Sequence, residues 1–109
     1  MAILQSATFN YAHISANTAA TTLFTPQATN ASSFAIMHSV CVNTKGTASN
    51  VLTIWDNTAA SGTSVAIVDT TLNQTTFMFD IACKNGLTIQ LATGGAADLT
   101  IAWRVYSQE

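Results

Sequence analysis

Charged residues are scarce in this sequence. Asp, Glu, Lys and Arg together make up 7% of its 109 residues, against roughly 25% in an average soluble domain. The three Lys and Arg residues are too few to neutralise the several phosphates that a nucleic-acid-binding surface contacts. We therefore expect no nucleic-acid partner.

Long apolar runs and an N-terminal basic segment are also missing. Ser, Thr and Asn interrupt every apolar stretch before it reaches the ~20 residues of a membrane-spanning helix. Residues 1–44 contain no Lys or Arg, whereas a secretory signal peptide starts with a basic segment. We expect no membrane partner and no Sec-type export. Because 49% of the residues are hydrophobic, we expect the chain to fold rather than remain disordered.

Cysteine is scarce as well. Cys41 and Cys83 are the two cysteines, too few for the dense disulfide framework of a small secreted scaffold, and we expect them to be buried thiols. The two histidines, His13 and His38, do not form an H-x₃-H pair, and no C-x₂-C pair is present to nucleate a zinc site. We therefore predict neither a metal site nor a cofactor.

Motifs that mark catalytic sites are absent from the sequence. It has no G-x-S-x-G elbow, and Gly94-Gly95 is not followed by the Lys-Ser/Thr of a phosphate-binding loop. Asp56 and Asp69 are the best candidates for a glycosidase-type carboxylate pair. A hairpin that turns at residues 57–62 would separate them by roughly 20 Å along its strands. We predict no catalytic residues and a protein that is not an enzyme.

The pattern that is present is alternation with a period of two, which indicates β-strands. Between Ser33 and Asn43 the sequence alternates strictly. This predicts one face formed by Phe34, Ile36, His38, Val40 and Val42, and an opposite face formed by Ala35, Met37, Ser39 and Cys41. Segments 51–56 and 63–69 predict a β-hairpin, because turn-forming residues lie between them.

Further strands are expected on both sides of these segments. Segments 75–81 and 87–91 flank Asn85-Gly86, a dipeptide typical of hairpin turns, and are predicted to form a second hairpin. After a turn at residues 93–95, the last strand should direct Leu99, Ile101 and Trp103 into the core and Arg104 and Tyr106 to the other face. Segments 8–14 and 21–25 are plausible first strands. No segment shows helical periodicity, so we expect almost no helix.

About eight short strands predict a single all-β domain built as a two-sheet β-sandwich. We expect a jelly-roll-like arrangement. An immunoglobulin-like sandwich is the alternative, because Cys41, Trp55 and Cys83 superficially match the Cys-Trp-Cys pattern of that fold. Residues 1–17 are expected to be an N-terminal arm or the first strand, and residues 18–109 the sandwich domain.

Aromatic side chains are the best candidates for contact with a partner. If Leu52 and Ile54 point into the sandwich, Trp55 points outward and could anchor an interface. The alternative is that Trp55 fills one end of the core. The predicted partner interface consists of Tyr11, Trp55, Arg104 and Tyr106.

Residues 37–104 resemble small virion proteins of tailed bacteriophages, of the kind that decorate or cement a capsid. The longest matching segment is the stretch from Leu52 to Thr63, which reads LTIWDNTAASGT. Shorter matches are VNTKG at 42–46, NGLT at 85–88, LATG at 91–94 and ADLT at 97–100.

This resemblance implies a small β-sandwich that acts through protein–protein contacts. The expected function is to stabilise a capsid as an oligomer, with the major capsid protein and further copies of itself, as a homotrimer, as partners. The expected location is the capsid surface of the virion, after assembly in the cytoplasm of the host bacterium. The alternative is a receptor- or glycan-binding module of a phage tail or fibre, with Tyr11, Trp55 or Tyr106 stacking on sugar rings.

Overall fold

Eight β-strands account for the regular structure of the residues that the structure describes. The structure is a computed structural model that describes residues 4–15, 19–26, 33–47, 50–92 and 97–108. The strands are β1 (Leu4–Ser15), β2 (Thr21–Phe24), β3 (Phe34–Thr44), β4 (Val51–Trp55), β5 (Ser64–Asp69), β6 (Thr76–Cys83), β7 (Leu87–Leu91) and β8 (Asp98–Gln108). Within these ranges, no helix is long and apolar enough to cross a membrane.

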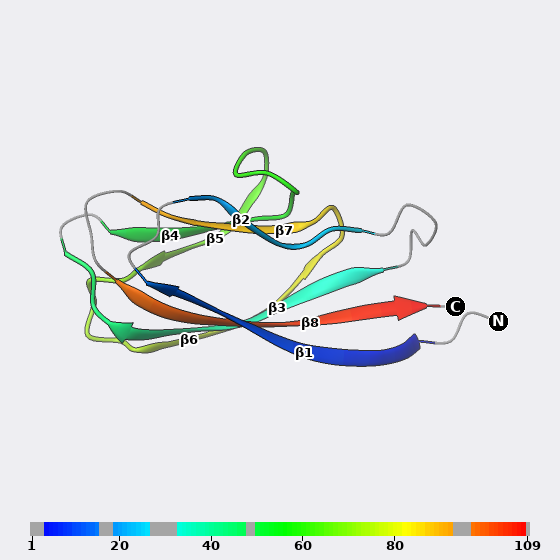
Figure 1. Ribbon diagram of the computed structural model, residues 1–109, viewed down its shortest axis with the longest axis horizontal. Helices are drawn as coiled ribbons and strands as arrows, with labels where there is room; N and C mark the ends of the chain where they lie inside the picture. The colour runs from blue at the N-terminus through cyan, green and yellow to red at the C-terminus, as the bar shows by residue number, and fades with distance from the viewer. Residues whose placement is uncertain (1–3, 16–18, 27–32, 48–49, 93–96, 109) are drawn as a thin grey trace.

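The strands form two antiparallel four-stranded sheets that pack face to face (Figure 1). Their orders are β1-β8-β3-β6 and β2-β7-β4-β5. The pairs β1/β8, β2/β7, β3/β6 and β4/β5 are nested, as in one long antiparallel hairpin that has been rolled up, and rolling adds the pairs β3/β8 and β4/β7. This is the jelly-roll arrangement, and it confirms the predicted fold. In an immunoglobulin sandwich the first two strands are neighbours in one sheet, whereas β1 and β2 lie in different sheets here.

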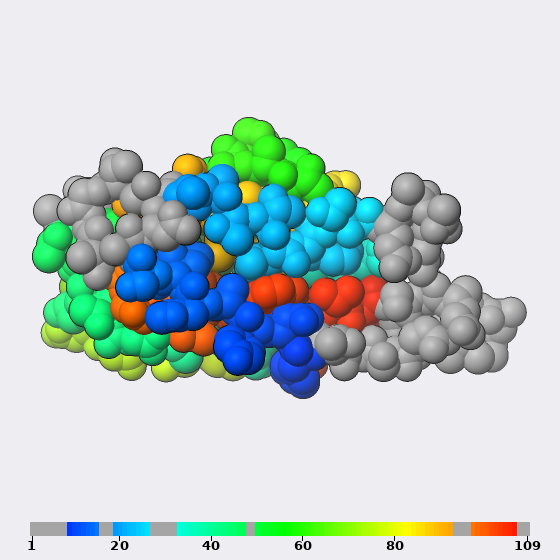
Figure 2. All heavy atoms as spheres, in the orientation of Figure 1, coloured from blue at the N-terminus to red at the C-terminus, as the bar shows by residue number. Residues whose placement is uncertain are grey.

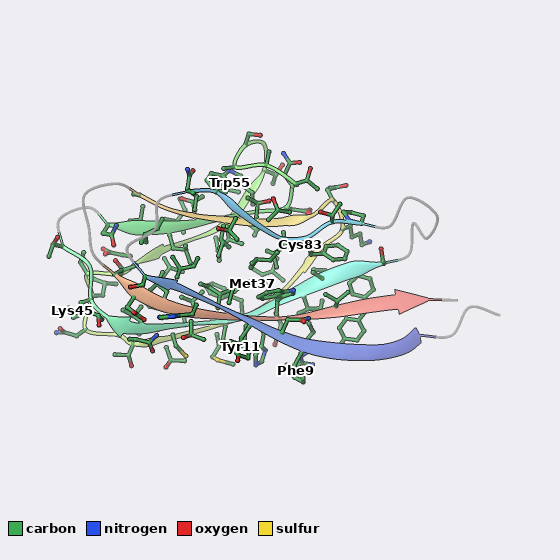
Figure 3. All side chains as sticks on the ribbon, in the orientation of Figure 1. Phe9, Tyr11, Met37, Lys45, Trp55 and Cys83 are labelled. Carbon is green, nitrogen blue, oxygen red and sulfur yellow. The ribbon has the colours of Figure 1, made fainter. Side chains whose placement is uncertain are left out.

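The core lies between the two sheets and is almost entirely apolar. Figure 3 shows Met37 and Cys83 in this layer. Its largest fully buried apolar side chains are Met37, Leu52, Ile54, Leu87, Ile89, Leu91, Leu99 and Ile101. Burial of each such side chain contributes about 1.5–3 kcal/mol relative to exposure. Trp103 is also buried in this cluster, as its alternation with Arg104 predicts.

The strict alternation predicted for β3 is wrong at its centre. The pairing register of β3 shifts between Met37 and Ser39 against both of its neighbours, β6 and β8. Between these two residues β3 has one residue more than β8 and one fewer than β6. Either shift reverses the faces that the later side chains of β3 occupy. Val40 and Val42 are therefore buried in the core, and Cys41 lies on the outer side of the sheet, with His38 rather than opposite it. The bulge lets both valines bury apolar surface without bringing the imidazole into the core.

The hairpin predicted at Asn85-Gly86 is also wrong, because β6 and β7 belong to different sheets. The chain crosses between the sheets at this point. Gly86 has a φ of 141°, and a Cβ there would lie 2.6 Å from the carbonyl oxygen of Asn57. The glycine is thus required by a positive φ and a close backbone approach, conditions that an Asn-Gly dipeptide satisfies in a crossing as well as in a hairpin.

The hairpin formed by β4 and β5 is confirmed. Val51 pairs with Asp69, and the amide of Asp56 donates to the carbonyl oxygen of Thr63 across 3.0 Å. Asp56 and Asp69 therefore lie at opposite ends of the hairpin, as predicted. The turn expected at residues 93–95 lies outside the described residues.

β1 is an edge strand that pairs with the last strand of its own chain. The pairing with β8 runs from Leu4 opposite Gln108 to Ser15 opposite Asp98. Within residues 1–17, the part from 4 to 15 therefore occupies the position of a first strand. The pairing brings the two ends of the sequence together along one sheet.

A buried cluster of polar groups joins the β3–β4, β5–β6 and β7–β8 connections. Asn50 and Thr70 are fully buried. The Thr70 hydroxyl donates to the Asn50 carbonyl across 2.6 Å, and the Asn50 side-chain amide donates to the carbonyl of Ala92 across 2.8 Å. The amide of Gly46 donates to the carbonyl of Thr70 across 3.1 Å. Every buried polar group named here therefore has a partner, as low-dielectric surroundings require.

We predict that Gly46→Ala lowers the free energy of unfolding by about 1–3 kcal/mol, because the side chains of Asn50 and Thr70 already fill the space for a Cβ. Urea denaturation would measure the change. Lys45→Ala is the control, since the exposed Lys45 donates only to the Asn73 side chain and should change stability by at most about 0.5 kcal/mol. Equal effects of the two substitutions would contradict the prediction.

Candidate interaction face

Large apolar side chains are exposed on the outer surface of the sheet β1-β8-β3-β6. Phe9 and Tyr11 of β1 are 64% and 78% exposed, and Met78 of β6 is 62% exposed. Figure 3 shows Phe9 and Tyr11 pointing away from the sandwich, on the side of the sheet opposite Met37. Exposed apolar surface gathered on one sheet marks a candidate contact surface for another protein. We call this surface the outer face, formed by Phe9, Tyr11, Phe34, His38, Met78, Asp80, Arg104 and Tyr106.

The pleat of β1 and β8 places these residues on one side. In β1, Ile14 is buried in the core. Phe9 and Tyr11 are an odd number of positions away from Ile14, so they point to the other side of the strand. In β8, Arg104 follows the buried Trp103 and therefore points to the outer side of the sheet. It lies directly across from Phe9. Cross-strand neighbours on one face of a sheet are close enough for their side chains to interact. The outer face is therefore built by the β1/β8 pairing.

Arg104 is at the centre of an ordered aromatic cluster. Its guanidinium carbon lies 4.6 Å from the centroid of the Phe9 ring, a cation–π contact. Its Nη1 donates to the Tyr106 hydroxyl across 3.4 Å. The Tyr106 ring in turn stacks on Phe34, with centroids 5.1 Å apart and planes 7° apart. These contacts hold four side chains from three strands in defined positions.

His38 lies on the outer face with Phe34, four residues before it in β3, and opposite the buried Met37. Its ring meets that of Phe9 edge to face, with centroids 6.0 Å apart. Its Nδ1 lies 3.5 Å from the Asp80 carboxylate, whose side chain is 77% exposed. This separation is longer than a good hydrogen bond, so the carboxylate keeps most of its capacity to bind another group.

A polar cluster around Asp98 joins three strands at the other end of the same sheet. His13 Nε2 of β1 lies 2.7 Å from Asp98 Oδ1, and the side-chain amide of Asn43 of β3 donates to the same oxygen across 2.9 Å. The hydrogen bonds from Asn43 and His13 lower the pKa of Asp98, and Ser15 adds a further one. Because Ser15 and His13 both bind the carboxylate, the arrangement ties strands together and differs from a serine nucleophile bound to its histidine base.

Trp55 lies apart from the other three predicted interface residues. Leu52 and Ile54 of β4 are fully buried, so Trp55 points to the outer side of the second sheet, where it is half-buried. Figure 3 shows it on the opposite side of the sandwich from Tyr11. The structure thus brings Tyr11, Arg104 and Tyr106 onto one face and does not bring Trp55 to it.

Sequence reasoning missed Phe9, His38 and Met78 as members of the outer face. Phe9 could have been found, because it lies two residues before Tyr11 and therefore on the same side of a strand. Met78 carries a weaker signal, since it alternates with the half-buried Phe77 and Phe79. His38 was missed because strict alternation groups it with Val40, and the sequence carries no signal for the bulge that separates the two.

The loop with the longest phage-like match has a structural role. It protrudes beyond the sheet β2-β7-β4-β5 (Figure 1). Asp56 Oδ1 accepts a hydrogen bond from the amide of Asn85 across 2.9 Å, and the Thr88 hydroxyl donates to the carbonyl of Asn57 across 2.8 Å. The Thr22 hydroxyl donates to the carbonyl of Thr58 across 3.1 Å. The loop is therefore fastened to both the crossing at residues 85–86 and the edge strand β2.

Both cysteines are free thiols, as expected, but the expected burial is confirmed for Cys83 alone. Cys83 is fully buried, whereas Cys41 is half-buried on the outer side of its sheet. Burial, with a smaller effect of the nearby Asp56 carboxylate, raises the pKa of Cys83 to about 11. A thiol in this state is a structural core group rather than a nucleophile.

No group of three or more His, Cys, Asp or Glu that could hold a metal ion occurs among the residues that the structure describes. No protein-family model matches the sequence, and a search of curated proteins finds no relative.

We predict that Cys83 resists alkylation in the folded protein. Because the pKa of Cys83 is raised from 9.0 to about 11, about 100-fold less thiolate is present at pH 8. In a Cys41→Ser variant, mass spectrometry after iodoacetamide treatment should therefore show labelling at least about 100-fold slower in buffer than in denaturing urea. Equal labelling rates in the two conditions would disprove the assignment.

We predict that Asp98 stabilises the fold at neutral pH and loses this effect in acid. Because its folded-state pKa is lowered, the contribution is present above the unfolded value of 3.8 and is lost as pH falls through the folded value. The melting temperature of Asp98→Asn should therefore fall less steeply below about pH 4 than that of the wild type. Asn43→Ala, which removes the strongest donor, should give an intermediate slope. A slope unchanged by Asp98→Asn would contradict this role.

Proposed function

We propose that this chain is a non-enzymatic structural protein of a tailed-bacteriophage particle, which decorates or cements the capsid as an oligomer. The observation that carries the proposal is the outer face, where exposed aromatic and apolar side chains lie on a firmly paired sheet. The resemblance of residues 37–104 to small virion proteins supports the phage setting.

Burial of apolar surface is the proposed mechanism. Each 1,000 Å² of apolar surface removed from water contributes on the order of 25 kcal/mol, before the entropic and polar costs of association are subtracted. The contacts of Arg104 with Phe9 and Tyr106 hold the cluster in place before binding, so less side-chain entropy is lost when a partner arrives. A surface with these properties would stabilise a capsid shell through protein–protein contacts alone, without catalysing a reaction.

The proposed partners are the major capsid protein and further copies of the same chain, as a homotrimer on the capsid surface. A net charge of −2 causes little repulsion between copies, and low net charge favours association. An oligomer multiplies weak contacts, because the second and third contacts form at high effective concentration. A shell protein built this way can bind firmly through small individual interfaces.

We predict that the purified protein binds undecorated capsids saturably, with a copy number that is a multiple of the capsid symmetry. Sedimentation followed by quantification of the bound protein would measure it. Tyr11→Ala should weaken binding by about 30-fold, since removal of an aromatic anchor at an interface costs about 2 kcal/mol or more. Thr63→Ala, in the exposed loop, is the control and should bind like the wild type.

Absence of saturable capsid binding by the wild type would contradict this proposal. The assignment would then move to a receptor- or glycan-binding module of the tail or fibre. In that case Tyr11→Ala should reduce binding to sugars and leave capsids unaffected.

A further inference from the structure

The exposed large apolar side chains lie at the two sides of the sandwich and not over its middle. Phe9 and Tyr11 are on β1 and Met78 is on β6, the two edge strands of one sheet, while Ile67 is on β5, an edge strand of the other. Leu72 is in the connection from β5 to β6. Among the described residues, the central strands β8, β3, β7 and β4 carry no large apolar side chain of comparable exposure.

On the outer face, the exposed apolar residues lie at two opposite edges. Phe9 and Tyr11 are at the β1 edge and Met78 is at the β6 edge, with β8 and β3 between them. Ile67 points to the outer side of the other sheet, because its neighbour Val68 is buried. Figure 2 shows β1 and β2 on the face toward the viewer. A partner that adds one strand to this sheet covers one of the two edges of the outer face and leaves the other exposed.

From Ala7 onward, the β1 edge lacks charge, proline and bulges, features by which proteins prevent edge strands from pairing with other chains. Its 12 residues, LQSATFNYAHIS, include no Asp, Glu, Lys, Arg or Pro, whereas edge strands are commonly protected by charge, proline or shortness. One irregularity in its register lies between Leu4 and Ala7, and from Ala7 onward β1 pairs regularly with β8. In the described part of the chain, β8 is the only strand that pairs with β1. The other edge of β1 is therefore suited to accept a strand.

The β6 edge of another copy has the right direction to fill this position. In an antiparallel sheet of four strands, the two edge strands run in opposite directions. Rotation of a second copy about an axis parallel to the strands therefore places its β6 antiparallel to β1. The sheet then continues from one molecule into the next with the same hydrogen-bonding pattern.

The side chains on the two edges are complementary in this arrangement. If Tyr11 lies opposite Met78 of the next copy, the antiparallel register also places Phe9 opposite Asp80. The methionine sulfur then meets an aromatic ring, a favourable contact. The exposed Asp80 carboxylate approaches the Arg104 guanidinium that lies over Phe9. Pairing of β1 with a second β1 would leave Met78 at the β6 edge exposed, and pairing of β6 with a second β6 would bring two Asp80 side chains together.

We propose that copies of this chain associate head to tail, with β1 of each copy pairing antiparallel with β6 of the next, and that this interface closes a ring. A contact between two different surfaces generates a closed ring when the repeated rotation returns to the first copy, and an open filament when it does not. The proposal deepens the oligomer part of the proposed function and does not depend on binding to a capsid.

Light scattering after size exclusion, applied to two charged variants, tests the proposal. The wild type should have a mass of several times the 11.4 kDa of one chain, and three times that mass for the expected trimer. Tyr11→Asp and Met78→Asp, at exposed positions on opposite edges, should each reduce the mass to that of a monomer, about threefold for the expected trimer. Ala59→Asp, which adds the same charge in the protruding loop, should leave the mass unchanged. Circular dichroism should show that all three variants keep the β-rich fold.

Cysteine cross-linking identifies which edges meet. Tyr11→Cys and Met78→Cys, each made in a chain without Cys41 and Cys83, should form few disulfide-linked dimers alone and many when mixed, because opposite cross-strand positions suit a disulfide. The proposal is overturned if the wild type is a monomer, if Met78→Asp keeps the wild-type mass, or if Tyr11→Cys alone dimerises as well as the mixture. A ring that fails to bind capsids would reject only the capsid role, and a monomer that binds capsids would reject only the ring.

Discussion

The antiparallel pairing of β8 with β1 on one side and with β3 on the other is the constraint on which the rest of this structure depends. One strand supplies Leu99, Ile101 and Trp103 to the core and Arg104 and Tyr106 to the outer face. The same two pairings bring Phe9 beside Arg104 and Phe34 beside Tyr106, and they carry the Asp98 cluster at the opposite end. Because β8 is the last strand and β1 the first, neither the core nor the face is complete until the ends of the chain have met.

The bulge in β3 reconciles two demands that a regular strand cannot meet together. A regular strand with Met37 in the core would direct Val40 outward and Ser39 inward, burying a hydroxyl in place of an apolar side chain. The shift in register between Met37 and Ser39 restores the valines to the core, while His38, on the side of the strand opposite Met37, stays at the surface against Phe9. Packing of the core and composition of the outer face are thus decided by one local distortion.

The scarcity of charged residues extends to the edge strand β1. Average composition spreads charged groups over every face of a domain, whereas here a long edge strand is left without any. The few charged groups that flank the exposed apolar residues, Arg104 and Asp80, lie near opposite edges of one sheet. A surface of this kind is costly for a protein that stays alone in water and favourable for one that is covered by neighbours.

The sequence by itself determined the strands, their faces where alternation is regular, and the β4/β5 hairpin, because these depend on residues two positions apart or joined by a short turn. It was enough to place Trp103 in the core and Arg104 and Tyr106 opposite it. Only the tertiary structure decided that β6 and β7 belong to different sheets, that β3 is bulged at His38, and that Tyr11 joins Arg104 while Trp55 does not. Each of these is a question of which distant strand lies alongside, and that depends on how two whole sheets bury their apolar faces against each other, not on any local pattern.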